Sequence, residues 1–275
     1  MPSINKFTEL ENTLFPVLEV PIPGMSLKGK PNESEWEFDC AESSGYKLII
    51  NDKTGNIISC MTEDYKLVKN ETIINQAIKP IENKGGILLE SITTNNDRKS
   101  YWKWNFPDIE VPMAGEEMNP TIEIHNSYDG STEIRILGGT FRLICSNGLM
   151  VGTVTSKYRN KHLHTNTQID NLGSIIESSI NSLIATFGPI GEQLADRKLK
   201  TKDIAQVAKE LFPQRTNDLF ISKVLLDKPK TYWDLLNVCT NLLTHHMHRD
   251  NQTTRQIESR LLPTLTKLAQ VEVPN

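Results

Sequence analysis

The sequence lacks most features that assign a chain to a special class. Only four of its 275 residues are cysteines, Cys40, Cys60, Cys145 and Cys239, and no two of them form a CxxC pair. This spacing excludes a zinc ribbon and a thioredoxin-like redox motif, so we expect buried thiols. No run approaches the roughly 18 apolar residues that span a membrane. The first residues lack the regions of a signal peptide. We therefore expect a cytoplasmic protein without a membrane partner.

Motifs of several common enzyme classes are also missing. The sequence has no P-loop, no GxGxxG fingerprint, no HExxH pair and no GxSxG elbow. These absences disfavour nucleotide hydrolysis, dinucleotide redox chemistry and the best-known hydrolase sites. We expect no cofactor, and an enzyme is the less favoured class.

Charge is distributed unevenly along an otherwise ordinary composition. The chain is 37% hydrophobic, with 30 Lys and Arg against 34 Asp and Glu. Residues 1–140 carry 13 basic and 22 acidic side chains, whereas residues 141–275 carry 17 and 12. From Ile134 to Ile169 there is no acidic residue. Such a basic stretch can bind an anion such as phosphate; the alternative is a solvated face neutralised by acids elsewhere in the fold.

The first half of the chain is predicted to be mainly β-structure. Residues 1–35 hold five prolines, which favours an extended arm over a helix. A turn near Gly55 predicts a hairpin at roughly 46–61. Further strands are predicted at 86–94 and 100–106, followed by a β-meander. Its turns are expected at Asp129-Gly130, Gly138-Gly139 and Asn147-Gly148. The exception is a short helix from Glu71 to Lys79, closed by Pro80, with Ile73, Ile74, Ala77 and Ile78 facing inward.

Helices dominate the second half. Apolar residues at three- and four-residue spacing predict a long helix from Asp170 that Gly188-Pro189 stops. The inward residues of this helix are Leu172, Ile175, Ile176, Ile180, Leu183, Ile184 and Phe187. Three more helices are predicted: one capped by Asp203 and ending near Leu211, one with a Thr231/Asp234 capping box running to about His248, and one from Thr254 kinked at Pro263.

This order of elements predicts an α+β fold, with an N-terminal antiparallel β-meander half carrying the basic segment and a helical C-terminal half. We divide the chain into a Pro-rich extended arm at 1–45, an α+β core with the meander and long helix at 46–190, and a helical region at 191–275 that packs on the core.

Three segments of the sequence are distinctive: YKLIINDKTGNIISCMTEDYKLVKN, the block NSYDGSTEIRILGGTFRLICSNGLMVG followed by HTNTQIDNL, and TYWDLLNVCTNLLTHHMHRDNQTTRQIESRL. Together they resemble a known family of phage- and plasmid-like proteins, the domain of unknown function 932. The resemblance implies a gene carried by a phage, a plasmid or a remnant of one. The polar positions that fall on the family pattern are Asn126, Asp129, Arg142, Asn147, His164, Asn237, His245 and Arg255. We expect Asp129 to shape the hairpin turn and Asn147 the strand end.

The favoured function is binding of single-stranded DNA. A β-meander, a basic segment and one long helix are similar in architecture to single-strand annealing recombination proteins, which form rings or filaments. Phosphate contacts need cations that acids do not cancel, and single strands add aromatic stacking. We therefore predict a homo-oligomer, a ring or filament, that promotes annealing or recombination. The predicted DNA-binding residues are Arg135, Arg142, Lys157, Arg159, Lys161, His164, Trp102 and Trp104.

Several alternatives stay open. Strand alternation puts Trp102 and Trp104 on one face and Lys103 on the other, so the indoles stack on bases or belong to the core. His245 and His248 share a helix face and, with His164, form a candidate metal site for a hydrolase or nuclease. The third alternative is a non-catalytic oligomeric structural or interaction protein.

Overall fold

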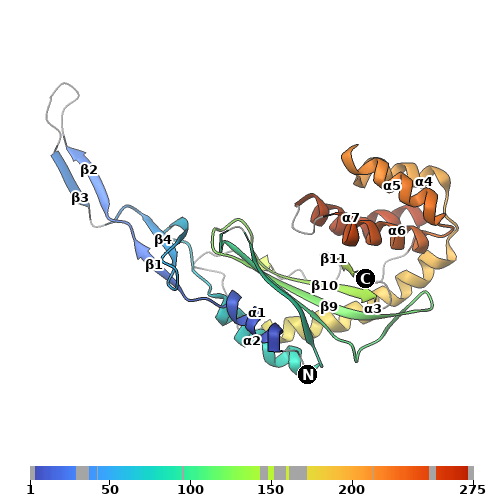
Figure 1. Ribbon diagram of the computed structural model, residues 1–275, viewed down its shortest axis with the longest axis horizontal. Helices are drawn as coiled ribbons and strands as arrows, with labels where there is room; N and C mark the ends of the chain where they lie inside the picture. The colour runs from blue at the N-terminus through green and yellow to red at the C-terminus, as the bar shows by residue number, and fades with distance from the viewer. Residues whose placement is uncertain are drawn as a thin grey trace.

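The structure is a computed structural model and describes residues 4–28, 37–41, 43–94, 96–142, 148–151, 159–160, 172–212, 214–247 and 252–271. Its first half is mainly antiparallel sheet, and its second half is mainly helix (Figure 1). The predicted α+β class is therefore confirmed. Within these ranges, no helix has the length and apolar character needed to cross a bilayer.

A seven-stranded antiparallel sheet forms the centre of the molecule. Its strands pair in the order β11-β10-β9-β7-β6, with β8 added to β9 and β12 added to β10. The strand bounds are β6 Ile87–Thr94, β7 Lys99–Asn105, β8 Val111–Met113, β9 Glu116–Ser127, β10 Ile134–Arg142, β11 Gly148–Val151 and β12 Arg159–Asn160. The strands predicted at 86–94 and 100–106 and the following meander are thus confirmed.

The turn between β9 and β10 forms at Asp129-Gly130, as predicted. Gly130 has a φ of 65°, a conformation that glycine adopts without a steric penalty. The Ser131 N–H donates to Oδ1 of Asp129 at 3.0 Å, so the aspartate closes the turn through its side chain.

The bend predicted at Gly138-Gly139 is wrong. Both glycines lie inside β10, where they face Ile122 and Thr121 of β9. On its other edge, β10 pairs with β11 at the same two positions. A strand with ladder hydrogen bonds on both sides is held extended, so the conformational freedom of the two glycines is not used to turn the chain.

One face of the large sheet is apolar and covered by helices. Three helices pack on it: α1 Ile4–Thr13, α2 Asn70–Asn83 and α3 Leu172–Asp196 (Figure 1). The buried residues that β7, β9 and β10 contribute to this face are Trp102, Trp104, Ile122, Ile124, Ile134 and Ile136. The predicted stripe of α3 supplies Leu172, Ile176, Ile180, Leu183 and Phe187, all buried. This interface is the main core of the protein.

Two prolines that were expected to end helices lie inside them instead. Pro80 is within α2, which continues to Asn83, and Pro189 is within α3, which continues to Asp196. Burial of Ile81 after Pro80 and of Ile190 and Leu194 after Pro189 extends each apolar stripe past the proline. The packing of these residues outweighs the loss of one backbone hydrogen bond, a helix penalty of about 3 kcal/mol.

The N-terminal region differs from the predicted extended arm in one respect. Residues 4–13 form helix α1, because this stretch is free of proline between Pro2 and Pro16. The following residues are extended, as predicted: β1 Val17–Pro21 joins β4 Tyr46–Asn51 and β5 Ile57–Thr62 in a small sheet, which confirms the hairpin at 46–61. Strands β2 Gly24–Lys28 and β3 Glu37–Ala41 form a hairpin that projects from one end of the molecule (Figure 1).

Four helices gather at the opposite end of the molecule (Figure 1): α4 Thr201–Leu211, α5 Gln214–Asp227, α6 Tyr232–His245 and α7 Gln252–Ala269. The capping box of α6 is confirmed, since Thr231 and Asp234 make both reciprocal hydrogen bonds. The cap predicted for α4 is wrong. Lys200 is its N-cap, and Asp203 is buried in the first turn, where it accepts a hydrogen bond from the Tyr232 hydroxyl.

Helix α5 was not predicted. It buries Phe220 and Val224, yet Leu225 and Leu226 are exposed, so its apolar residues do not form the single stripe that identifies a helix in sequence.

Candidate functional site

The face of the large sheet opposite the helices α1–α3 is polar. It holds the residues that alternate with the core residues on β7, β9 and β10, and we call it the polar face: Tyr101, Lys103, Asn105, Thr121, Glu123, His125 and Arg135. Helices α6 and α7 contact the sheet at β11, its edge strand. A sheet with one apolar and one polar face is typical of antiparallel architecture, but here most of the polar residues are buried.

Register places the polar residues in rows across the strands. Arg135 of β10 faces His125 of β9, which in turn faces Tyr101 of β7. The next row joins Leu137, Glu123 and Lys103. On its other side, Arg135 faces Arg159 of β12. The ladder thus brings two arginine positions that lie 24 residues apart in sequence directly opposite each other.

Glu123 is the centre of a charged network on this face. Its Oε1 lies 3.5 Å from Nζ of Lys103, and its Oε2 lies 3.1 Å from Nε2 of His125. Lys103 is only 2% exposed, so its charge requires a partner. Tyr101 stacks on the His125 ring at 5.8 Å between ring centroids and donates its hydroxyl to Glu90 at 3.0 Å. These contacts restrain five side chains, and they engage the carboxylates of both Glu123 and Glu90.

Two polar atoms of the same face have no partner. The Nε of Arg135 and the Oδ1 of Asn105 are both buried, and neither makes a hydrogen bond with any residue that the structure describes. Asn105 is 5% exposed, and Arg135 is half-buried. An orphaned buried polar group costs about 1–3 kcal/mol, so native structures seldom retain one without a use. The Nε–H of Arg135 is a donor open to an anion, whereas Oδ1 of Asn105 is an acceptor, which suits a hydrogen-bond donor of a ligand and not its anionic group.

The DNA-binding residues predicted from sequence are found in different environments. Trp102 and Trp104 are 0% and 1% exposed and belong to the core, the alternative left open above, so neither offers a ring to a base in this structure. Lys103 lies on the opposite face from them, as predicted. Arg142 ends β10 opposite Met118, a buried residue, and Arg159 lies in β12. The other predicted contacts, Lys157, Lys161 and His164, lie outside the described residues.

A model of a domain of unknown function, DUF932, matches residues 57–263, about three-quarters of the chain. The chain belongs to the DUF932 family. The match begins in β5 and ends in α7, so it includes the whole polar face and leaves out β1 and the β2–β3 hairpin. No curated protein and no solved structure matches the chain significantly.

One of the polar positions that follow the DUF932 pattern has a structural role. Asn126 is buried and donates through Nδ2 to the carbonyl of Val68 at 3.0 Å and to Oδ1 of Asn70 at 2.8 Å. Asn70 in turn donates to the carbonyl of Thr13 and to Ser100. This hub connects the end of α1, the start of α2 and two central strands. Asn126 therefore fastens the helices to the sheet.

The remaining DUF932 positions are spread over the molecule. Asn147 lies outside the described residues, and of Arg255 only its place in α7 is described. His245 is exposed at the last residue of α6, while His248 and His164 also lie outside. In the part of the chain that the structure covers, no three His, Cys, Asp or Glu side chains are arranged to hold a metal ion.

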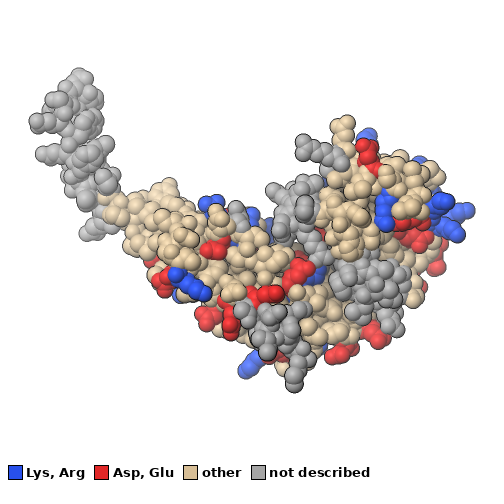
Figure 2. Space-filling view, in the orientation of Figure 1, with Lys and Arg blue, Asp and Glu red and all other residues tan. Residues whose placement is uncertain are grey.

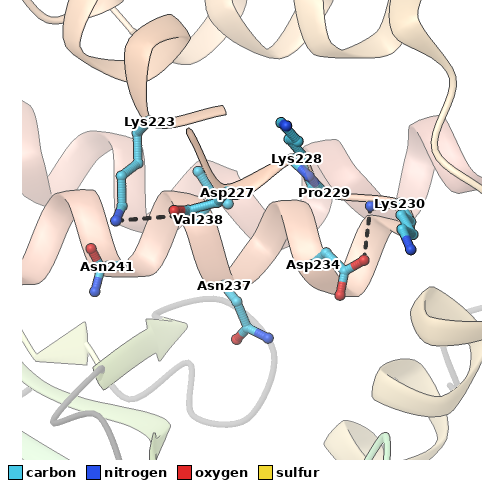
Figure 3. A pocket seen from close by; sticks show the side chains of 9 residues that line it. All are labelled: Lys223, Asp227, Lys228, Pro229, Lys230, Asp234, Asn237, Val238 and Asn241. Atoms are coloured by element: carbon cyan, nitrogen blue, oxygen red, sulfur yellow. Dashed lines mark hydrogen bonds and ion pairs between the residues drawn. The ribbon is translucent and has the colours of Figure 1, made fainter. Parts of the chain in front are cut away.

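Asn237 lines a groove of about 400 Å³ at the helical end of this DUF932 protein (Figure 3). Asn237 and Asn241 project from α6 one turn apart. Lys223 and Asp227 of α5 form an ion pair at one end of the groove, at 3.2 Å. At the other end, the backbone N–H of Lys230 donates to Asp234 at 2.8 Å. Two lysines of the connecting loop, Lys228 and Lys230, complete the wall.

Burial raises the pKa of several phenols and a thiol away from the polar face. The pKa of Tyr232 rises to about 12, first because of desolvation and then because of the adjacent Asp203 carboxylate. Burial likewise raises the pKa of Tyr65, Tyr128 and the Cys239 thiol above their usual ranges. Cys239 is buried and therefore inert, as expected, whereas Cys60 of β5 is exposed, so the expectation of buried thiols is wrong for that residue.

Sequence analysis missed Tyr101, Asn105, Glu123 and His125. The signal for them was the same alternation that paired Trp102 with Trp104: the odd-numbered residues of β7 and β9 are polar over the length in which the even-numbered ones are apolar.

Proposed function

We propose that this DUF932 protein binds single-stranded DNA at the β10–β12 edge of the polar face, where Arg135 is half-buried, and promotes strand annealing or recombination for a phage- or plasmid-type element. It would act in the cytoplasm, as a homo-oligomeric ring or filament and without a cofactor. The observation that carries the proposal is Arg135, whose Nε is buried without a partner on the polar face, opposite the arginine position of β12.

A phosphate group would meet the requirements of this arrangement. Like charges directly opposite each other in a ladder are destabilising, and an anion that contacts both relieves the repulsion. Phosphate oxygens accept two hydrogen bonds from one guanidinium in a fixed geometry, which is why arginine is preferred over lysine for such contacts. Glu123 is engaged by Lys103 and His125, and Glu90 by Tyr101, and among the described residues no carboxylate forms an ion pair with Arg135.

The architecture supports a single strand as the ligand by analogy alone. A β-meander with one long helix on its back, as β9–β11 and α3 form here, is similar to the core of annealing proteins. The arginine positions of β10 and β12 at the edge of the polar face offer contacts to a backbone whose bases are unpaired.

The experiment that tests the proposal is binding of a fluorescent oligonucleotide, single-stranded and as its duplex, at about 50 and 200 mM salt, with the oligomer mass measured in parallel. We expect single-strand binding by an oligomer that weakens steeply with salt. Arg135→Gln should lower the slope of log affinity against log salt by about 0.7, the value for one phosphate contact with a single strand.

Arg260→Gln, an exposed arginine on α7, is the matched control and should leave the slope unchanged. The proposal is contradicted if the wild-type protein binds no single strand at about 50 mM salt.

A further inference from the structure

A second group of cations lies at the helical end of the molecule, away from the polar face. It consists of six exposed residues on two loops and the first turn of α4, and we call it the helical-end cluster: Arg197, Lys198, Lys200, Lys202, Lys228 and Lys230. Figure 2 shows Lys and Arg side chains gathered on the surface of this end. The first loop joins α3 to α4, and the second joins α5 to α6.

Backbone hydrogen bonds hold the two loops together. The Leu199 N–H donates to the carbonyl of Lys230 at 2.8 Å, and the Tyr232 N–H donates to the carbonyl of Arg197 at 3.2 Å. Lys198 and Thr231 form an antiparallel bridge between them. The fold therefore brings together two short basic segments that are about thirty residues apart in sequence. Neither segment is long enough to be recognised in the sequence as a basic run.

Most acidic side chains near the cluster are already engaged. Asp227 pairs with Lys223, Asp234 accepts the N–H groups of Lys230 and Thr231, and Asp203 is buried against Tyr232. Asp196, at the end of α3, is the exposed carboxylate next to the cluster. Among the described residues, no ion pair joins any of the six cations to a carboxylate. Hydrogen bonds from neutral donors do not cancel the charge of a carboxylate, so Asp196, Asp203 and Asp234 all count against the cluster. The six cations outnumber these three carboxylates, and the surface has a net positive charge.

The conformation of the second loop presents its lysines to solvent. Lys228 directly follows the last residue of α5 and has a φ of 49°, a left-handed conformation that is more common for glycine or asparagine at this position. Lys228 and Lys230 flank Pro229 and border the groove in which Asn237 and Asn241 of α6 lie (Figure 3). Ammonium groups beside carboxamides offer hydrogen-bond donors for phosphate and sugar oxygens.

We propose that the helical-end cluster is a second contact surface for the sugar-phosphate backbone of the DNA. The inference rests on the proposed function for the identity of the ligand, but it concerns different residues. When exposed cations of a protein neutralise phosphates, they displace the counterions condensed on the polyanion. The release of these counterions is the main driving force of backbone binding. Two separate surfaces would let one protomer hold a strand at two places along its length.

The test uses the full-length protein and a fluorescent oligothymidylate. The variant carries Lys200→Gln, Lys228→Gln and Lys230→Gln, and the control carries Lys53→Gln, Lys69→Gln and Lys79→Gln. All six lysines are exposed, Lys200 and Lys69 are both helix N-caps, and the two variants have the same net charge. Circular dichroism confirms that each variant is folded.

We expect the cluster variant to bind roughly tenfold more weakly than the control at about 50 mM salt, and its salt slope to be lower by about 2, which corresponds to three lost phosphate contacts. Equal binding by the two variants, with Arg135→Gln still weakened, overturns this inference and leaves the polar face in place. The converse result, a weak cluster variant and an unaffected Arg135→Gln, supports the cluster and removes the polar face from the proposed function.

A third result identifies a different partner. Residues 31–45 carry five acidic side chains and no basic one, so a second copy of this chain is a competing polyanion. If the cluster variant has a smaller oligomer mass but unchanged DNA affinity, the surface is a contact between copies and the inference is overturned.

Discussion

The two faces of the large sheet are made by the same strands, but one face carries apolar side chains and the other polar ones. On β7, Trp102 and Trp104 enter the core against α2 and α3. Tyr101 and Lys103, which alternate with them along the strand, belong to a buried polar network. The apolar face is held by packing and by buried hydrogen bonds, such as that from Nε1 of Trp102 to the Thr13 hydroxyl. On the polar face, Nε of Arg135 and Oδ1 of Asn105 have no hydrogen-bond partner among the described residues. The comparison shows that burial alone does not indicate whether every polar atom of a sheet face has a partner.

The largest effect is expected on the apolar face. Trp104→Ala should lower the free energy of unfolding by about 3–5 kcal/mol, because it leaves a large cavity between the sheet and its helices. Urea unfolding followed by circular dichroism measures this change. Ile57→Ala, at a position that is 61% exposed, is the control and should change the free energy by less than about 0.5 kcal/mol. A similar loss for both variants would show that Trp104 is not a core residue.

A smaller loss is expected when a charge is removed from the polar network. Lys103→Met should destabilise the protein by about 3 kcal/mol, because Glu123, whose side chain is largely withdrawn from solvent, then loses its lysine partner. The double variant with Glu123→Gln should lose clearly less than the sum of the two single changes. Additive losses in this double-mutant cycle would mean that the two side chains do not interact.

The third prediction concerns the pH dependence of stability on the helix side of the sheet. Tyr128 lies on the helix side of the sheet, where its hydroxyl accepts the Asn70 N–H at 2.8 Å, and burial raises its pKa. Because the pKa of Tyr128 is raised in the folded state, its protonated hydroxyl contributes its full stabilisation below pH 10, which is its pKa in the unfolded chain. This contribution decreases as the pH rises above 10. The loss is about 1.4 kcal/mol for each further pH unit until the folded pKa is reached. Unfolding free energies between pH 9 and 11 should therefore fall less steeply in Tyr128→Phe. Parallel curves would contradict the assignment.

The smallest change in stability is expected at Arg135. Because its Nε has no partner among the described residues, Arg135→Met removes an orphaned polar group and should change the free energy of unfolding by less than about 1 kcal/mol, or increase it. The measurement is the same urea titration, in the absence of nucleic acid. A loss as large as that of Lys103→Met would show that Arg135 is part of the structural network instead of a free ligand contact.

Local signals in the sequence were sufficient for much of the fold. The capping box at Thr231 and the Asp129-Gly130 turn depend on residues within three positions of each other, and both are present. The stripe of α3 was equally clear. Pro80 and Pro189 were misjudged because tertiary packing keeps the two helices continuous. At Gly173, a Cβ would lie 2.8 Å from Cγ of Pro80, so α3 approaches the proline as closely as glycine allows.

The candidate site was less accessible to sequence reasoning. The pattern identified Arg135 and Arg159 as basic, but their apposition depends on a β10–β12 pairing that no local signal encodes. The helical-end cluster likewise depends on the meeting of two loops about thirty residues apart. Composition can indicate that charge is unbalanced, whereas only long-range pairing determines which charges become neighbours.

The hub at Asn70 has a consequence for hydrogen exchange. The first N–H groups of a helix have no partner within the helix and normally exchange quickly with solvent. The Asn70 N–H, at the start of α2, is instead bound by the Tyr128 hydroxyl, and its side chain is bound to residues 30 to 57 positions away. These partners separate only when the strands and helices separate. The amide proton of Asn70 is therefore tied to the global opening of the protein, and its exchange rate reports the stability of the entire β-half.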